Sequence, residues 1–352
     1  MASQERTNAI QNVKNYIGKP IAIIAAVVLI GAFIIWYMEV INTTVNALNA
    51  IFPSSTDQTR FSVRTGAVFG LVTSLLAIGG IRLIKWVCTL FFPFLILSIL
   101  YLQFTSNVET NIKSTFGFSF FAIISVVAIT LPGFINLPTF FRHSRSKSDS
   151  FLALSLITLF DIIFQSSSIF IGISTPNDIY VLFSGNQFDL SLILSFIFIS
   201  MICLNMVNIY FSSAALETIL PHASSSKEYA LVGLIGTAAY TFFQISSPMI
   251  FLENLADNFI ASLGIILLLT FLVRIIVRHR PRPFEKLISC FCWFAGCITA
   301  TIAQIHSQDG SHSLVAGICA SILSFLVIIF IEETIWSIRH LSSVKKSSHL
   351  NN

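Results

Sequence analysis

Long apolar segments separated by short polar ones make up most of this 352-residue chain. Most of these segments hold the ~20 apolar residues that an α-helix needs to cross a hydrocarbon layer of ~30 Å. The pattern predicts about ten transmembrane helices, over residues 19–42, 63–80, 81–104, 115–140, 151–174, 189–214, 229–247, 257–277, 287–305 and 313–336.

The polar segments are too short to bury a core of their own. We therefore predict an all-α integral membrane protein in three parts. These are a cytoplasmic N-terminal segment (1–18), a transmembrane bundle (19–336) and a cytoplasmic C-terminal tail (337–352). The first 18 residues are polar and no small-residue cleavage pattern follows the first span, so we expect no cleavable signal peptide.

Composition and charge agree with this interpretation. The chain is 55% hydrophobic and only 10% charged, whereas a soluble domain is about 25% charged. With the N-terminus inside, 17 of the 20 Lys and Arg lie in inner segments and only Arg60, Arg64 and Lys113 lie outside. This distribution follows the positive-inside rule and predicts that both termini are cytoplasmic. The net charge of +4 then reflects orientation and not nucleic-acid binding.

Enzyme and metal-site patterns are missing from the sequence. It has no Gly-x-Ser-x-Gly, no His-Glu-x-x-His and no phosphate-cradling loop, so we predict neither an enzyme nor a cofactor. The six Cys all lie in predicted helices, where reduced thiols act as small apolar residues. His306, Asp309 and His312 have metal-like content, but their loop is short, and we predict no metal site there.

The fourth predicted span contains helix-breaking residues. Pro132, Gly133, Asn136 and Pro138 stand inside its hydrophobic run, and Pro removes a backbone donor while Gly permits unwinding. Irregular backbone at membrane depth is tolerated where it lines a cavity or is covered by protein. A broken helix of this kind indicates the binding site of a transporter; the alternative is a simple proline kink.

The segment after this break resembles a family signature. Asn136-Leu-Pro-Thr-Phe-Phe-Arg142, followed by a basic loop to Asp149, is similar to the Asn-Ile-Pro-Asp-Phe-Thr-Arg motif of the nucleobase:cation symporter-1 family, which includes cytosine, allantoin and hydantoin permeases. Three further stretches resemble that family in the same order. They are Gly80 to Pro93, Asn208 to Leu216, and Gly233 to Thr237.

The resemblance covers nearly the whole chain and implies a fold and a function. Family members have the leucine-transporter architecture of two inverted five-helix repeats around a midplane site. The first span here, with Lys19 and Trp36, corresponds to the family's third helix, so the bundle is expected to be incomplete and to lack the first two helices. A separate fragment supplying them is therefore an expected partner, beside the lipid bilayer.

Several residues match substrate-binding positions of the family. Trp36 matches a tryptophan that stacks on the substrate ring, with an interfacial anchor as the alternative, and Glu39 lies one position from a substrate-binding glutamine, with a solvated helix end as the alternative. Asn205 and Asn208 share one helix face, where amides can read a base edge or join two helices.

The break itself adds Gly133, Phe134 and Asn136 to the expected cavity. Asp161 is the most deeply placed carboxylate of the chain, and proton coupling is one hypothesis for it, beside a protonated or paired structural role.

Departures from the family count against sodium coupling, and the candidate coupling ions are Na⁺ and H⁺. Thr139 replaces the aspartate of the signature, and the paired hydroxyls of the family's eighth helix fall on Leu204 and Asn205, or on Ile202 and Cys203. The leading hypothesis is a permease for a nucleobase or related small heterocycle in a bacterial-type inner membrane. The alternatives are a truncated or divergent transporter-like protein without activity of its own, and a membrane scaffold.

Overall fold

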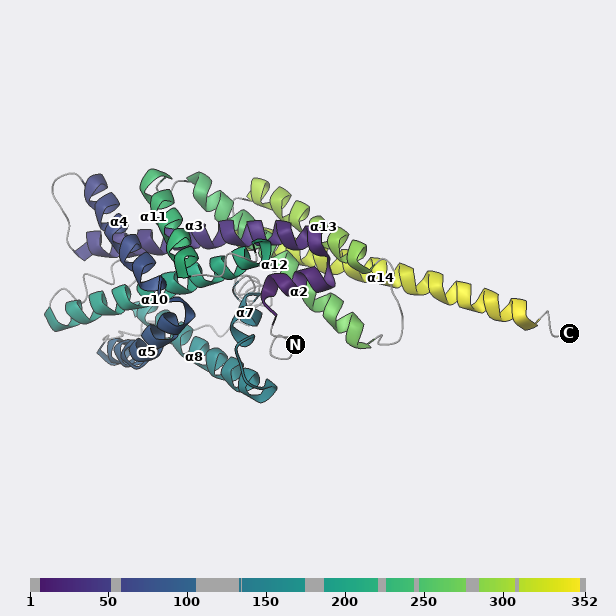
Figure 1. Ribbon diagram of the computed structural model, residues 1–352, viewed down its shortest axis with the longest axis horizontal. Helices are drawn as coiled ribbons and strands as arrows, with labels where there is room; N and C mark the ends of the chain where they lie inside the picture. Colours follow the sequence, from purple (N-terminus) through teal and green to yellow (C-terminus); the bar gives the residue numbers. More distant parts are fainter. Residues whose placement is uncertain are drawn as a thin grey trace. The chain divides into compact units, whose positions relative to one another are not determined.

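The computed structural model describes residues 7–51, 58–105, 133, 135–174, 187–220, 226–243, 247–276, 285–307 and 310–348. These residues form helices and no strand, so the predicted all-α fold is confirmed (Figure 1). The helices are α2 (Ala9–Tyr16), α3 (Lys19–Ile51), α4 (Gln58–Ala77), α5 (Gly80–Thr105), α7 (Leu137–Phe141), α8 (Lys147–Ser174), α10 (Gln187–Ile219), α11 (Ser226–Phe243), α12 (Ser247–Ile276), α13 (Glu285–Ser307) and α14 (Gly310–Ser348).

Seven of the described helices are long and apolar enough to cross a membrane, namely α3, α5, α8, α10, α12, α13 and α14. Helices α4 and α11 coincide with two further predicted spans but are shorter, at 20 and 18 residues, and less apolar. Most of the predicted fourth span, 115–140, lies outside the described residues. Helices α3 and α14 extend past the predicted ends of their spans, to Ile51 and Ser348.

The chain divides into two compact units. The described residues that fall within 7–8, 29–105 and 138–253 belong to the first, and those that fall within 9–28, 133, 135–137 and 254–348 belong to the second. Helix α3 passes from the second unit to the first between Val28 and Leu29.

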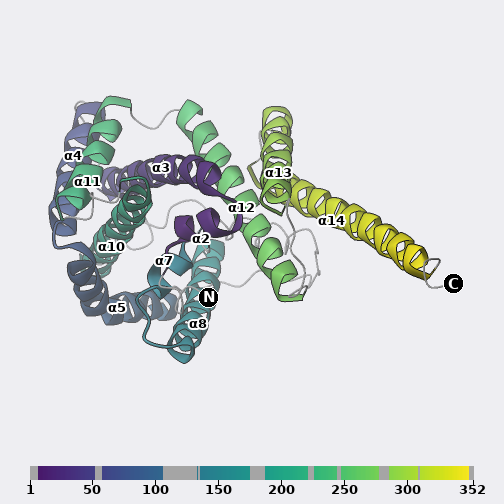
Figure 2. The same ribbon diagram turned by 45° about the vertical axis from the view of Figure 1, so that its right-hand side comes forward.

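In the first unit, α4 and α11 lie side by side (Figures 1 and 2). Glycines permit this approach, because a Cβ at Gly70 would lie 2.5 Å from Thr237 Oγ1 and one at Gly233 would collide with Ser74. Tyr37 of α3, 2% exposed, joins the pair through its hydroxyl. This hydroxyl donates to Gly70 O at 2.8 Å and lies 3.1 Å from Thr237 Oγ1.

In the second unit, α13 lies along the first half of α14 (Figures 1 and 2). A Cβ at Gly296 would lie 2.8 Å from Gly317 O, and one at Gly317 would lie 2.8 Å from Ala300 Cβ. Gly296 and Ala300 are four apart on α13, as are Gly317 and Ser321 on α14. These small residues allow close backbone contact, a common packing mode of transmembrane helices.

The second unit also contains α2, which lies within the segment expected to be polar and cytoplasmic. Its Ile10, Val13 and Tyr16 are buried, and their spacing of three residues places them on one helix face. The Tyr16 ring meets Phe271 edge-on at 6.3 Å between centroids, and the Arg274 guanidinium lies 4.3 Å from the centre of the Tyr16 ring. The N-terminal segment is therefore partly a packed element and not only a tail.

Candidate functional site

A buried polar stripe runs along α10 in the first unit. Asn205, Asn208 and Ser212 are 0%, 5% and 0% exposed. Their spacing of three and four residues places them on one face of the helix, over a length of about 10 Å. Two of the three were expected from the sequence to form a substrate-binding face.

The contacts of neighbouring residues show which element the stripe faces. Phe211, on one side of the stripe, stacks on Phe33 of α3 at 5.3 Å between ring centroids. Ile209, on the other side, packs in one cluster with Tyr37 and Ile41 of α3. Phe211 thus contacts α3 directly and Ile209 shares a cluster with α3, so this side of α10 is directed toward the region of α3 around Phe33 to Ile41.

Hydrogen bonding of the stripe is incomplete. Among the described residues, neither Oδ1 nor Nδ2 of Asn205 has a partner, nor does Ser212 Oγ. Each buried polar group left unpaired costs about 1–3 kcal/mol, and such groups are rare in native proteins. The stripe therefore offers donors and acceptors suited to a polar ligand or to water, and in this conformation they are closed to solvent.

An aromatic group lies beside the stripe. The Trp36 ring meets Phe33 edge-on at 5.1 Å between centroids and is itself half-buried. Through Phe33, Trp36 is connected to Phe211 of α10. Glu39, three residues further along α3, is exposed. The structure thus brings Trp36 into the aromatic surroundings of the stripe and leaves Glu39 outside them.

The predicted helix break is present where the chain is described. Gly133 is helical and exposed, a turn follows at Ile135 and Asn136, and α7 begins at Leu137. The Asn136 backbone N–H donates to Gly133 O at 3.3 Å. Asn136 is 3% exposed, and its Nδ2 has no partner among the described residues. Phe134, the other residue expected here, lies outside the described residues.

Asp161 occupies a different environment. It is exposed on α8, where its Oδ2 accepts a hydrogen bond from Gln165 Nε2 at 3.0 Å. The stripe on α10 is buried, so the structure does not combine the two in one buried site. Across the described residues no group of three His, Cys, Asp or Glu could hold a metal ion, and the six cysteines are free. Asp309, from the metal-like run, lies outside the described residues.

A polar network holds the segment after α7 against the C-terminal part of α10. Arg142 Nη1 lies 3.4 Å from Glu217 Oε2. His143 Nε2 lies 3.1 Å from the Tyr210 hydroxyl, which also lies 3.2 Å from the Thr139 carbonyl. The pKa of His143 is lowered below its ordinary value. Burial is the main cause, the nearby Arg142 cation adds to it, and Glu217 acts in the opposite direction. We call Arg142, His143, Tyr210 and Glu217 the α10 latch.

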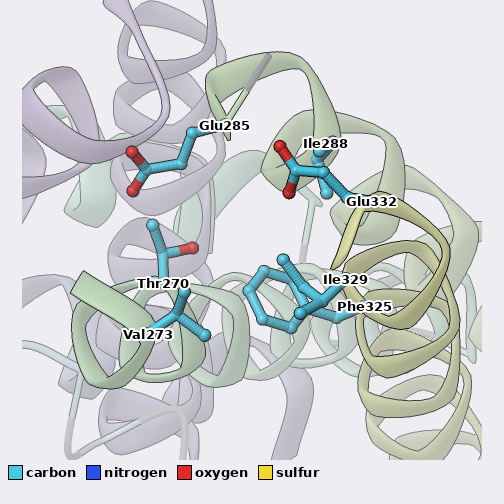
Figure 3. Close-up of a pocket in the computed structure, with 7 residues that line it drawn as sticks. All are labelled: Thr270, Val273, Glu285, Ile288, Phe325, Ile329 and Glu332. Atoms are coloured by element: carbon cyan, nitrogen blue, oxygen red, sulfur yellow. The ribbon is translucent and has the colours of Figure 1, made fainter. Parts of the chain in front are cut away.

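A small pocket in the second unit contains two carboxylates (Figure 3). Glu285 and Glu332 lie along one edge, and Phe325 and Ile329 lie opposite them. The space holds about one water molecule. Glu285 Oε1 accepts a 2.6 Å hydrogen bond from Arg274 Nε. None of the residues predicted from the sequence lines this pocket, and it is too small for a ring-shaped ligand.

Sequence reasoning did not identify three residues of these sites. Ser212 could have been found by extending the spacing of Asn205 and Asn208 by one helical turn. Tyr37 belongs to no motif, and the sequence does not show that it is buried. Once it is buried, its hydroxyl needs hydrogen-bond partners. Glu217 gave no signal, because its partner Arg142 is 75 positions away.

Comparison with known proteins places the chain in a broad class. No family model matches it. It is 34% identical over 111 residues to a protein described as an uncharacterized membrane protein of Buchnera aphidicola subsp. Schizaphis graminum (strain Sg). The match covers 29% of this chain and 33% of that relative, so the chain spans about a third of the length of the curated relative it matches. The helices and this similarity together define an all-α membrane protein.

Proposed function

We propose that the chain is a secondary transporter that carries a nucleobase or a related small heterocycle by alternating access, with no enzymatic step. The observation that carries this proposal is the Asn205 side chain. It is fully buried, and both of its polar atoms lack a partner among the described residues. An amide held in this state can donate to and accept from the edge of a heterocycle.

Aromatic side chains beside the amide support the same ligand class. Trp36, Phe33 and Phe211 follow one another in ring contact next to the stripe. Flat π-surfaces favour stacking with a flat heteroaromatic ring. The resemblance of residues 136–149 to the symporter signature points to such ligands independently of these contacts.

The proposed setting is a bacterial-type inner membrane with both termini cytoplasmic, as the distribution of Lys and Arg predicts. A coupling ion, Na⁺ or H⁺, would drive accumulation. Asp161 is exposed on α8 and gives no support to a role in coupling. By the resemblance, a partner fragment would supply the two helices that precede α3 in the family.

The test is uptake of labelled cytosine, uracil, hypoxanthine and allantoin into transporter-null cells that express the full chain. We expect uptake of at least one compound above background, and its loss in an Asn205→Leu variant present at equal amounts in the membrane. Background uptake of all four, with no ligand-induced shift in the Tm of the purified protein, would contradict the proposal. If uptake appears only when a fragment with two further helices is co-expressed, the chain is one part of a split transporter.

A further inference from the structure

Helix α8 presents an unusually open surface. It contributes the candidate span Lys147–Ser166, and none of the residues in the most apolar part of that span is buried. Its large apolar side chains Phe151, Leu152 and Ile162 are 73%, 61% and 58% exposed. An apolar exposed surface is expected where a helix faces lipid, so these residues alone indicate no partner.

Three polar residues interrupt this apolar surface. Thr158, Asp161 and Gln165 are all exposed, and their spacing of three and four residues places them on one face. Gln165 Nε2 donates to Asp161 Oδ2 at 3.0 Å, and Thr158 Oγ1 donates to Leu154 O at 3.0 Å. A carboxyl group and a primary amide offer more donors and acceptors than one shared hydrogen bond uses. We call Thr158, Asp161 and Gln165 the α8 polar face.

The position of this face along the helix makes it costly in lipid. Asp161 is 14 residues beyond Lys147, which is about 21 Å along the helix axis. This depth is within a hydrocarbon layer of ~30 Å. Carboxylic side chains at such depth generally face a protein surface or a water-filled cavity and not lipid. The α8 polar face therefore requires a polar partner outside the contacts that α8 makes in its own unit.

We propose that the α8 polar face is the surface through which two copies of the chain associate, α8 against α8. The hydrogen bond within α8 places the Gln165 amide at the height of the Asp161 carboxylate. Two copies inserted in the same orientation and related by a two-fold axis have parallel α8 helices. The amide of each copy then lies level with the carboxylate of the other and can donate its second N–H to it. Such self-complementarity is what an isologous interface requires.

Interhelical hydrogen bonds between polar side chains favour this association. In membranes such bonds contribute about 1–2 kcal/mol in model helices. A symmetric contact forms two of them. Their loss should therefore raise the dissociation constant of the dimer about tenfold or more.

The experiment measures self-association of the full chain in liposomes. Two populations carrying donor and acceptor fluorophores on C-terminal tags are mixed, and energy transfer is followed as the protein is diluted with lipid. The test variant is Asp161→Leu/Gln165→Leu. The matched control is Ser166→Leu, which also replaces an exposed polar residue of α8 but lies about 140° around the helix from Asp161 and about 100° from Gln165.

We expect the wild-type chain and the control variant to associate with dissociation constants within about twofold of each other, and the test variant to associate about tenfold more weakly or worse. The Tm of each variant verifies that it folds. Equal association of the test variant and the wild type would overturn the proposal. A wild-type chain that is monomeric at every protein-to-lipid ratio would also overturn it. The polar partner of α8 would then be a different membrane protein.

A cross-linking measurement keeps the proposal testable if the double variant does not fold. Under oxidising conditions, a Thr158→Cys variant should form a covalent dimer in the membrane. A Leu156→Cys variant, at an exposed position on the opposite side of α8, should not. The native cysteines lie on α5, α10, α13 and α14, so the unmodified chain provides the baseline. Equal cross-linking at both positions would contradict the proposed face.

Discussion

Phe33 of α3 and Phe211 of α10 stack at 5.3 Å between ring centroids, with an angle of 25° between their planes. The stack fixes the side of α10 that faces α3, and it thereby determines where the polar stripe lies. Trp36 extends the aromatic contact by one ring. The stripe is buried on α10, and the α3 aromatic residues lie beside it. Its side chains gain nothing from water there and depend on partners from protein or ligand.

This arrangement predicts that Asn205 lowers the free energy of unfolding of the protein. Replacing it by Leu removes two unpaired polar atoms from a buried position, and should raise the free energy of unfolding by about 1–3 kcal/mol. The same change should abolish ligand binding, because Leu lacks the donor and the acceptor that the amide would offer to the ligand. Thermal unfolding in detergent measures the first effect and ligand-induced Tm shifts measure the second. A stabilised variant that still binds ligand would show that the amide has no functional role.

At Asn258 on α12, the same substitution to Leu should change the free energy of unfolding in the opposite direction. It is 1% exposed, and its Nδ2 donates to Gln304 Oε1 and to Ser313 Oγ, both at 3.1 Å. Asn258→Leu would remove both of these buried hydrogen bonds, so we expect the free energy of unfolding to fall by about 1–3 kcal/mol. Thermal unfolding of the two variants under identical conditions is the measurement. Equal effects of Asn205→Leu and Asn258→Leu would contradict the assignment of Asn205 as an unpaired group.

The sequence predicts the helices well because hydrocarbon allows few alternatives. A segment with ~20 apolar residues must satisfy its backbone internally, and helix is the solution. The exposed fifth span shows the limit of this reasoning. Its composition resembles that of the buried spans, and only the folded chain shows that Asp161 faces outwards on α8 while Asn205 is buried on α10.

The candidate site was partly predictable for a related reason. Helical periodicity correctly places Asn205 and Asn208 on one face, because the rule is local. The contact of Phe211 with Phe33 joins residues 178 positions apart, and no local pattern encodes it. The Tyr37 hydroxyl is a similar case, since its partners Gly70 and Thr237 lie on two other helices.

Because α4 and α11 approach closely at Gly70, one added methyl group there should lower the stability of the protein. Gly70→Ala would place a Cβ 2.5 Å from Thr237 Oγ1 and disturb the site where the Tyr37 hydroxyl binds. We expect the free energy of unfolding to fall by about 1–3 kcal/mol. The matched control is Gly31→Ala on α3, where a Cβ meets nothing within 4 Å, and where the better helix propensity of Ala should give a gain of up to about 1 kcal/mol. Thermal unfolding of both variants measures these changes. A Gly70→Ala variant as stable as the wild type would show that α4 and α11 do not approach this closely.

The α10 latch predicts a dependence on pH. Burial and the Arg142 cation lower the pKa of His143 in the docked state, and Arg142 Nε donates to its Nε2 at 3.2 Å. A protonated ring would direct a second donor at that guanidinium. The undocked segment has the ordinary pKa of about 6.5 and binds protons first, so docking weakens as the pH falls below this value and the loss is complete below the lowered pKa.

Hydrogen exchange of residues 137–146, corrected for the intrinsic pH dependence of exchange, measures the opening of the latch. Between about pH 7.5 and about pH 5.5, on either side of the ordinary pKa, the opening equilibrium of the wild-type chain should increase several-fold. A His143→Gln variant keeps a hydrogen-bonding group beside Tyr210 but cannot take up a proton, so its opening should not change over this range. The ion pair between Glu217 and Arg142 is present in both proteins. An equal response of the wild type and the variant would assign the pH dependence to a group other than His143.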